Sequence, residues 1–303
     1  MRDLFSSPIF SQVSGLLEKY GERIKQAEMV HISAPASLEG VLALGQLEAA
    51  CLDVGLKYRR RLFTARHHLP RDAPPAWTTE DAGLSVIVDA EEATWEVSEL
   101  QEMPHIHLVP LTTSVELGEQ NRKLGGALDT VVQAAALAAY LAPNGRRVRK
   151  LRPYLSLGLW LGGAMDTSMD PIHTTMLSHL KEEGSVRIVP LPEVESPSPG
   201  MLPGLSERQL TRLSKVWTTM DVDERSLALS ELILPCLTES ELSTPRLEEL
   251  VWHRMVVGEE KTDIASQAHT VKKAWPEEKN DAKLFASSLL DRWLGTGSLT
   301  ADP

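Results

Sequence analysis

The chain has 303 residues, of which 42% are hydrophobic and 24% charged, and its formal net charge is −11 at neutral pH. This composition supports a globular protein with a sizeable core, and the acidic balance argues against a protein that coats nucleic acid over its whole surface. No apolar run reaches the roughly 20 residues of a membrane span, and residues 1–17 lack the continuous apolar segment of a secretory signal. We therefore expect a cytoplasmic protein without membrane contact, in which Cys51 and Cys236 are buried thiols.

In chain order, the first 190 residues alternate between helical and strand-like patterns. Apolar positions with helical spacing predict an amphipathic helix over residues 8–27. Short apolar segments predict strands at residues 29–33, 57–63, 84–90, 105–111 and 186–191. Further helices are predicted at residues 41–55, 91–101, 126–142 and 171–184, with one more buried helix within residues 146–166. This alternation indicates an α/β domain whose mostly parallel sheet is flanked by helices.

A proline-rich segment separates this part from the rest of the chain. Residues 190–205 include PLPEVESPSPGMLPG, which can continue neither a helix nor the interior of a sheet. We therefore predict an α/β domain at 1–189, a linker at 190–205 and a mainly helical domain at 206–303. Start signals for the C-terminal helices are Ser206 with Gln209, Asp221, and Thr244 followed by proline. Two more helices are predicted at residues 263–275 and 277–294.

Four segments carry short patterns at the predicted ends of strands and helices. The loop in VHISAPASLEG offers Ser33 and Gly40 but almost no acid, whereas the strand SVIVDA ends in Asp89. The segment GLWLGGAMD ends in Asp166. The strand in HLVPLTT is followed only by uncharged residues, namely Pro110, Leu111 and Thr112.

This order of elements and motifs, over residues 28–190, resembles the DHH phosphoesterase superfamily, in particular its RecJ-like branch of archaeal type. In that family, acids and histidines at these four places hold two metal ions. Here Ala36 and Leu38 stand where the first motif has aspartates, and the Asp-His-His run of the third motif is missing. The resemblance therefore implies a degenerate member with no catalytic residues and no cofactor. The remnants of the ancestral site would be Ser33, Gly40, Asp89 and Asp166.

A two-metal phosphoesterase needs about four to six hard ligands, so the loss of two motifs argues against catalysis. We expect an inactive scaffold or adaptor in DNA replication or repair. The resemblance implies similarity to the inactive RecJ-like subunit of a replicative helicase, with the GINS complex and the MCM motor as partners. Two alternatives stay open. One is an active phosphoesterase or nuclease in which Asp89, Asp166 and His107 hold Mn²⁺ or Mg²⁺, and the other is an unrelated nucleotide- or metabolite-binding α/β protein.

The histidines give no complete metal site. His105 and His107 lie two apart on a predicted strand and would face the same side, which suits a metal, but a solvent-facing sheet edge is the favoured interpretation. His67 and His68 lie in a polar loop and are expected at the surface. His173 follows a loop in which Asp170 is expected to cap a helix.

Two basic clusters contrast with the acidic total. The first contains Lys57, Arg59, Arg60 and Arg61. The second contains Arg146, Arg147, Arg149, Lys150 and Arg152. Arginine forks suit phosphate, so single-stranded DNA is a candidate ligand at Lys57, Arg59, Arg61, Arg146, Arg147, Arg149 and Lys150. The alternative interpretation is a solvated basic face, or side chains that pair with the many Glu and Asp residues. The C-terminal tryptophans are expected to be mostly core anchors, and a docking face for a partner protein is the alternative: Trp217, Trp252, Trp275 and Trp293.

Overall fold

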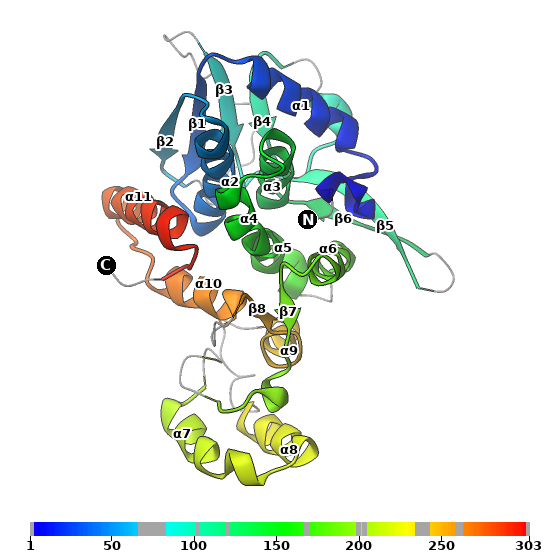
Figure 1. Cartoon of the computed structure of the whole chain (residues 1–303), viewed down its shortest axis with the longest axis vertical. Helices are drawn as coiled ribbons and strands as arrows, with labels where there is room; N and C mark the ends of the chain where they lie inside the picture. Colours follow the sequence, from blue (N-terminus) through cyan, green and yellow to red (C-terminus); the bar gives the residue numbers. More distant parts are fainter. Residues whose placement is uncertain are drawn as a thin grey trace.

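The computed structural model describes residues 3–65, 83–100, 103–118, 122–166, 170–197, 201, 205–233, 243–258 and 263–300. Its centre is a parallel sheet in the order β2-β1-β3-β4 (Figure 1). The strands are β1 (Val30–Pro35), β2 (Tyr58–Phe63), β3 (Leu84–Val88) and β4 (Ile106–Leu108). These four strands lie where the sequence predicted them, and the predicted α/β class with a parallel sheet and flanking helices is confirmed.

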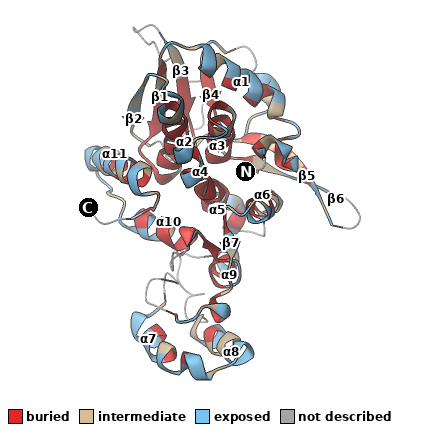
Figure 2. Cartoon of the chain, in the orientation of Figure 1, coloured by how far each residue is buried: buried red, intermediate tan, exposed pale blue. Residues whose placement is uncertain are grey.

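One face of the sheet is apolar because the side chains of each strand alternate between the two faces. Val30, Ile32 and Ala34 of β1 are buried on this face, and two helices pack over the sheet there. These are α2 (Leu38–Val54) and α3 (Thr130–Leu141), in which nearly every residue is buried (Figure 2). A helix that is apolar on all sides is stable only when it is enclosed in this way.

Local signals set the ends of these helices. The Oγ of Ser37 accepts the Gly40 amide at 3.2 Å and begins α2, and Gly55 ends it with a φ of 72°. The carboxylate of Asp129 accepts two amides at the start of α3. The predicted first helix is shorter than expected, since α1 (Ser14–Gln26) follows two short 3-10 turns over Leu4–Ser6 and Pro8–Phe10.

The segment between β3 and α3 differs most from the prediction. The helix predicted at 91–101 is wrong, because only Val97–Leu100 forms a 3-10 turn and Trp95 bridges to the strand that begins at Leu111. The strand predicted at 105–111 ends at Leu108, and an antiparallel hairpin follows that the sequence analysis missed. Its strands are β5 (Leu111–Leu117) and β6 (Arg122–Leu128), so the helix predicted from residue 126 begins only at Thr130.

Shorter elements complete the first part of the chain. They are α4 (Arg146–Leu151), α5 (Ser156–Leu161), α6 (Pro171–Glu182) and β7 (Arg187–Ile188). Helix α6 starts at the predicted cap Asp170, whose Oδ1 accepts the Ile172 amide at 2.9 Å. Strand β7 lies within the predicted range, but it does not join the main sheet and pairs antiparallel with β8 (Met255–Val256).

Helices dominate the C-terminal part, as predicted. They are α7 (Glu207–Val216), α8 (Val222–Ile233), α9 (Thr244–Trp252), α10 (Ile264–Lys273) and α11 (Lys279–Thr296). Ser206 precedes α7 without a side-chain hydrogen bond, whereas Asp221 and Glu224 form the reciprocal capping pair at α8.

Helices α10 and α11 return to the α/β core, whereas α7 and α8 lie at the far end of the molecule (Figure 1). Helix α11 packs against α2 and β2, and α10 packs against α5 and α2. One continuous buried core includes residues from both sides of the proline-rich segment. The division into domains at 190–205 stays a prediction.

Candidate functional site

A cavity of about 740 Å³ lies at the carboxyl ends of the parallel strands. In an open α/β sheet this edge is the usual place for a ligand. Its walls come from the loops after β1, β3 and β4, from the first residues of α3, from the end of α5 and from α10. The described lining includes Ser37, Glu39, Glu91, Pro110, Asp129, Gly158, Gly162, Asp170, Lys272 and Trp275.

Asp129 is the most constrained acid of this cavity. Its Oδ1 accepts the amides of Val131 at 2.6 Å and Val132 at 2.9 Å, so it caps α3. Its Oδ2 is buried and accepts no hydrogen bond from the described residues. Burial raises the pKa of this carboxyl to about 7, and the charge of Asp170 adds to the rise. Sequence analysis did not select Asp129, although an aspartate before an apolar helical run is a capping signal.

Gly158 of α5 leaves the room that the Asp129 carboxylate occupies. A Cβ atom at position 158 would lie 2.7 Å from Cγ of Asp129 and 2.7 Å from Cβ of Val131. Asp170, the second acid of the cavity, is buried, and that burial raises the pKa of its carboxyl. The cavity thus holds two carboxylates that each cap a helix.

The predicted remnants of the ancestral site are spread over separate local environments. Ser33 is buried in β1, and Gly40 lies in α2, where a Cβ atom would be 2.8 Å from the Cγ of Pro35. Asp89 is buried, with its Oδ2 3.5 Å from Nε2 of His107. Neither Asp89 nor Asp166 belongs to the described lining of the cavity.

Asp166 is held by an arginine from the C-terminal part of the chain. Nε of Arg246 donates to Oδ1 of Asp166 at 2.7 Å and Nη2 donates to Oδ2 at 3.1 Å. Nη2 also donates to the carbonyls of Leu161 and Gly162. Burial acts to raise the pKa of Asp166, but the Arg246 hydrogen bonds and charge outweigh it and leave this pKa below its ordinary value. Sequence reasoning missed Arg246, since its partners are about 80 residues away.

In the part of the chain that the structure describes, no three His, Cys, Asp or Glu residues are grouped so as to hold a metal ion. His105 lies just before β4 and His107 lies within it, and their ring centroids are 6.0 Å apart. The solvent-facing interpretation is wrong for His107, which is fully buried beside Trp95 because that tryptophan covers this face of the sheet. His173 is also buried, and desolvation, with a contribution from His253, lowers its pKa to about 4.

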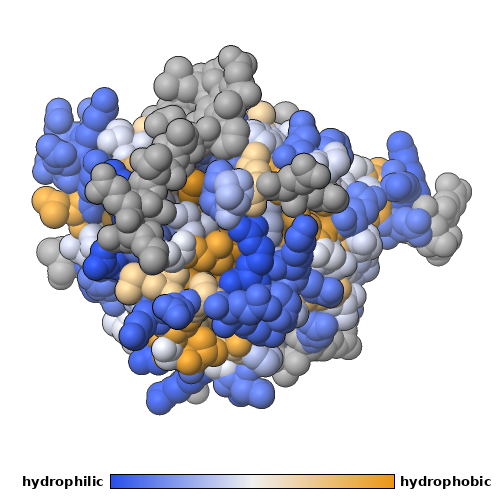
Figure 3. All heavy atoms as spheres, turned by 90° about the horizontal axis from the view of Figure 1, so that it is seen from above, coloured by the Kyte–Doolittle hydropathy of each residue, from blue (hydrophilic) through white to orange (hydrophobic). Residues whose placement is uncertain are grey.

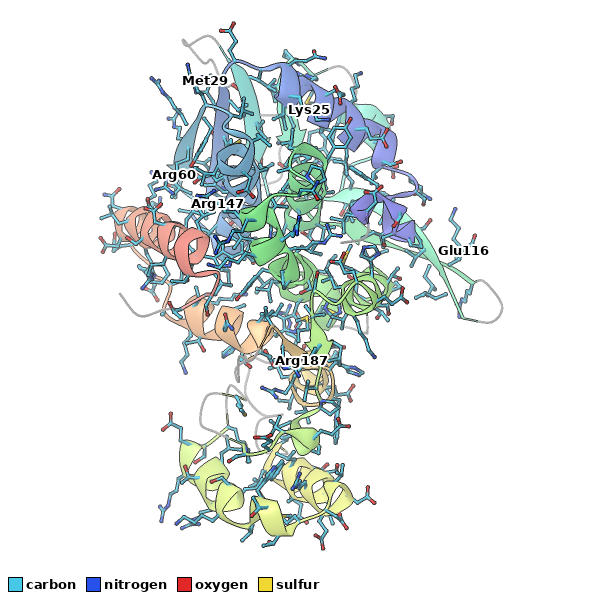
Figure 4. The ribbon with its side chains drawn as sticks, in the orientation of Figure 1. Lys25, Met29, Arg60, Glu116, Arg147 and Arg187 are labelled. Carbon is cyan, nitrogen blue, oxygen red and sulfur yellow. The ribbon has the colours of Figure 1, made fainter. Side chains whose placement is uncertain are left out.

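The first basic cluster divides between the two faces of β2. Lys57, Arg59 and Arg61 alternate along the chain and are exposed. Arg60 points to the other face, where it lies 2.8 Å from Asp291 of α11 and 3.6 Å from Glu48 of α2 (Figure 4).

The second basic cluster forms α4 and is mostly tied to neighbouring elements. Arg147, labelled in Figure 4, pairs with Asp53 at 3.1 Å. Arg149 bonds to Asn144, and Nζ of Lys150 donates to the carbonyl of Gly295 at 2.7 Å. Arg146 is exposed on the same helix.

Arg152 does not belong to a basic surface, and it fits the alternative interpretation of pairing with an acid. It is buried, and its guanidinium forms a two-pronged ion pair with Glu183 at 2.6 and 2.7 Å. Its place at the start of a 3-10 turn directs it into the core.

Other predicted residues lie as follows. Trp217 and Trp293 are core anchors, as expected, whereas Trp252 is 37% exposed. Cys51 is buried. Cys236, His67 and His68 lie outside the described residues. Seen from above, the molecule presents mainly hydrophilic residues with small hydrophobic patches between them (Figure 3).

Comparison with known proteins gives similarity among solved structures only. No family model matches the chain, and no curated protein matches it either. The structure is similar to that of CDC45 from Entamoeba histolytica, with a TM-score of 0.45 and 10% sequence identity, over 93% of this chain and 72% of that chain. A similarity of this strength does not establish membership of a family. Among the described helices, none combines the length and the apolar character needed to cross a membrane.

The contacts of Arg246 predict unequal effects of two substitutions. Arg246→Ala leaves two carbonyls and Asp166 without their donor, so we expect a loss of about 2–4 kcal/mol in the free energy of unfolding. Asp166→Asn should cost less than about 1 kcal/mol, because the Asp166 side chain is 48% exposed. Urea unfolding measures the free energy of unfolding of each variant. Equal losses in the two variants would contradict the larger structural role of Arg246.

The pKa of Asp129 predicts how stability depends on pH. A folded-state pKa of about 7, against an ordinary 3.8, means that the folded protein binds this proton more tightly than the unfolded chain. The stabilisation by this proton is complete below about pH 4 and is lost as the pH rises to about 7. Asp129→Asn removes this titration. The unfolding free energy of the variant, relative to that of the wild type, should therefore increase as the pH rises from about 4 to about 7. Urea titrations at several pH values measure the two unfolding free energies. If the difference between wild type and variant does not change with pH, the pKa of Asp129 is not raised.

Proposed function

We propose that this protein is a RecJ-like scaffold in DNA replication or repair, and that it binds partner proteins rather than cleaving nucleic acid. One observation carries the proposal: four carboxylates at or near the carboxyl edge of the sheet already contact groups of the chain itself. Asp89 lies beside His107, and Arg246 binds Asp166. Asp129 and Asp170 accept backbone amides at the starts of α3 and α6.

Metal-dependent phosphoester cleavage needs carboxylates that are free to bind metal ions. Paired Mg²⁺ or Mn²⁺ ions need several oxygen or imidazole ligands converging at about 3.5–4 Å separation. A metal at Asp166 would have to displace the guanidinium that binds both carboxylate oxygens. At the first and third motif positions, Ala36 and Pro110 supply no ligand side chain to the cavity wall.

Exposed apolar residues support a role in binding other proteins. Val216 and Val222 are each 48% exposed and Leu227 is 67% exposed, all on the segment of α7 and α8. This segment lies at the end of the molecule away from the sheet (Figure 1), so a partner could reach it freely. By the family resemblance, the proposed partners are GINS and MCM. Single-stranded DNA is a further proposed ligand on the exposed face of β2, at Lys57, Arg59 and Arg61.

The absence of nuclease chemistry is directly testable. Purified protein incubated with end-labelled single-stranded DNA and Mn²⁺ should release no product above a no-protein control. The Asp89→Ala variant serves as the matched sample for any contaminating nuclease. Turnover that the wild type has and Asp89→Ala lacks would establish the alternative, an active metal-dependent phosphoesterase.

Partner binding can be tested with two leucines of similar exposure. Recombinant GINS and MCM should co-elute with the full chain in size-exclusion chromatography. We expect Leu227→Glu on α8 to weaken this association at least tenfold, because burying an unpaired charge in an interface is costly. Leu284→Glu on α11, where the leucine is 69% exposed, is the control and should bind normally. Failure of both proteins to co-elute with the wild type would contradict the proposed partners.

A further inference from the structure

The cavity at the sheet edge has a strongly unbalanced charge. Four acids belong to its described lining, namely Glu39, Glu91, Asp129 and Asp170, and they face a single base, Lys272. Acids that share one recess reinforce each other, because the surrounding protein screens their charges less than open water does. The potential in the cavity therefore favours a cation and opposes a phosphate.

The helix starts around the cavity strengthen this preference. Free amides at a helix N-terminus commonly bind phosphate or another anion. Here the starts of α3 and α6 are already occupied by Asp129 and Asp170, whose carboxylates accept the amides of Val131, Val132 and Ile172. The groups that would attract an anion are satisfied, and the capping groups bring negative charge of their own.

One carboxylate oxygen still lacks a partner. Oδ2 of Asp129 is buried and receives no hydrogen bond from the residues that the structure describes. An unpaired buried acceptor is costly, and a carboxylate is more costly than a neutral group. Gly158 makes the space in which this carboxylate sits, since a Cβ there would collide with it. A cation in the cavity would offset the charge of this carboxylate and so reduce the cost of burying it.

The size and the aromatic wall of the cavity limit the kind of cation. A space of about 740 Å³ is within the range of sites for small organic molecules and is much larger than a single metal ion requires. Trp275 lines the cavity and is supported by an edge-to-face contact with Phe285, at a centroid distance of 5.1 Å. Indole faces attract ammonium and guanidinium groups and pack against the carbon chains that carry them.

We propose that this cavity binds an organic cation, an ammonium or guanidinium group on a short carbon chain, which pairs with Asp129 and packs against Trp275. Such a group has two possible sources, a free small amine or the side chain of a partner protein. The site is independent of the scaffold role, because it requires neither nuclease activity nor a replication partner.

The test compares ligands of one shape and different charge. Isothermal titration of the full chain would use acetyl-arginine amide and its neutral analogue acetyl-citrulline amide. We expect the arginine compound to bind at least tenfold more tightly. The affinity for agmatine, a free small amine, is measured in the same way and compared with that for acetyl-arginine amide. Tighter binding of agmatine would identify a small-molecule source, and tighter binding of acetyl-arginine amide a side-chain source, and both results support the cation site.

Two conservative substitutions locate the binding. Asp129→Asn keeps an oxygen that caps α3 but removes the charge, so we expect at least a tenfold loss of affinity with an unchanged circular dichroism spectrum. Asp53→Asn is the matched control, because Asp53 also accepts two amides at a helix start, those of Arg147 and Val148, yet lies outside this cavity.

Several outcomes would overturn the proposal. Equal affinity for the arginine and citrulline compounds would remove the charge requirement. Binding unaffected by Asp129→Asn, or no binding of either cation to the wild type, would remove the site. Stoichiometric Mn²⁺ binding that Asp129→Asn abolishes would replace the organic cation with a metal. Apart from Mn²⁺ binding, which would also favour the metal-dependent phosphoesterase, these results do not bear on the nuclease or partner experiments, so the two proposals can fail separately.

Discussion

The enclosure of α2 is the constraint on which the rest of the structure depends. This helix contacts β1 and the helices α3, α4, α5, α10 and α11, and it is buried along most of its length. Its polar residues must therefore find partners inside the protein: Gln46 donates to the carbonyl of Leu151, and Glu48 accepts from Tyr58 at 3.2 Å. Gly45 lets Trp293 of α11 pack directly against the helix. Through these contacts α2 positions the sheet, α4 and the last helix of the chain together.

The residues that cap the helices also line the cavity at the edge of the sheet. A helix that starts inside the protein has free amides that need partners, and here Ser37, Asp129 and Asp170 accept them at the starts of α2, α3 and α6. All three caps line the same cavity, although only Ser37 follows a strand of the parallel sheet. The capping carboxylates thus stabilise the fold and also determine which ligand charge the cavity accepts.

The C-terminal helices contact the α/β part of the chain at several places. Arg60 of β2 pairs with Asp291 of α11, and Arg246 of α9 binds Asp166. Lys272 and Trp275, from α10 and the residues after it, form one wall of the cavity. This wall of the cavity exists only when α10 is packed against the α/β part of the chain.

The sequence by itself determined the parallel strands, the buried helix after β1 and the cap at Asp170, because apolar runs and capping residues act over a few positions. It did not determine the β5–β6 hairpin, whose alternation in LTTSVEL was obscured by an adjoining apolar strand, nor the place of Arg152, which its basic neighbours suggested was exposed. The convergence of Asp129, Asp170 and Trp275 on one cavity was decided only by the tertiary structure. Pairings over tens of residues depend on how helices pack, and no local pattern encodes that packing.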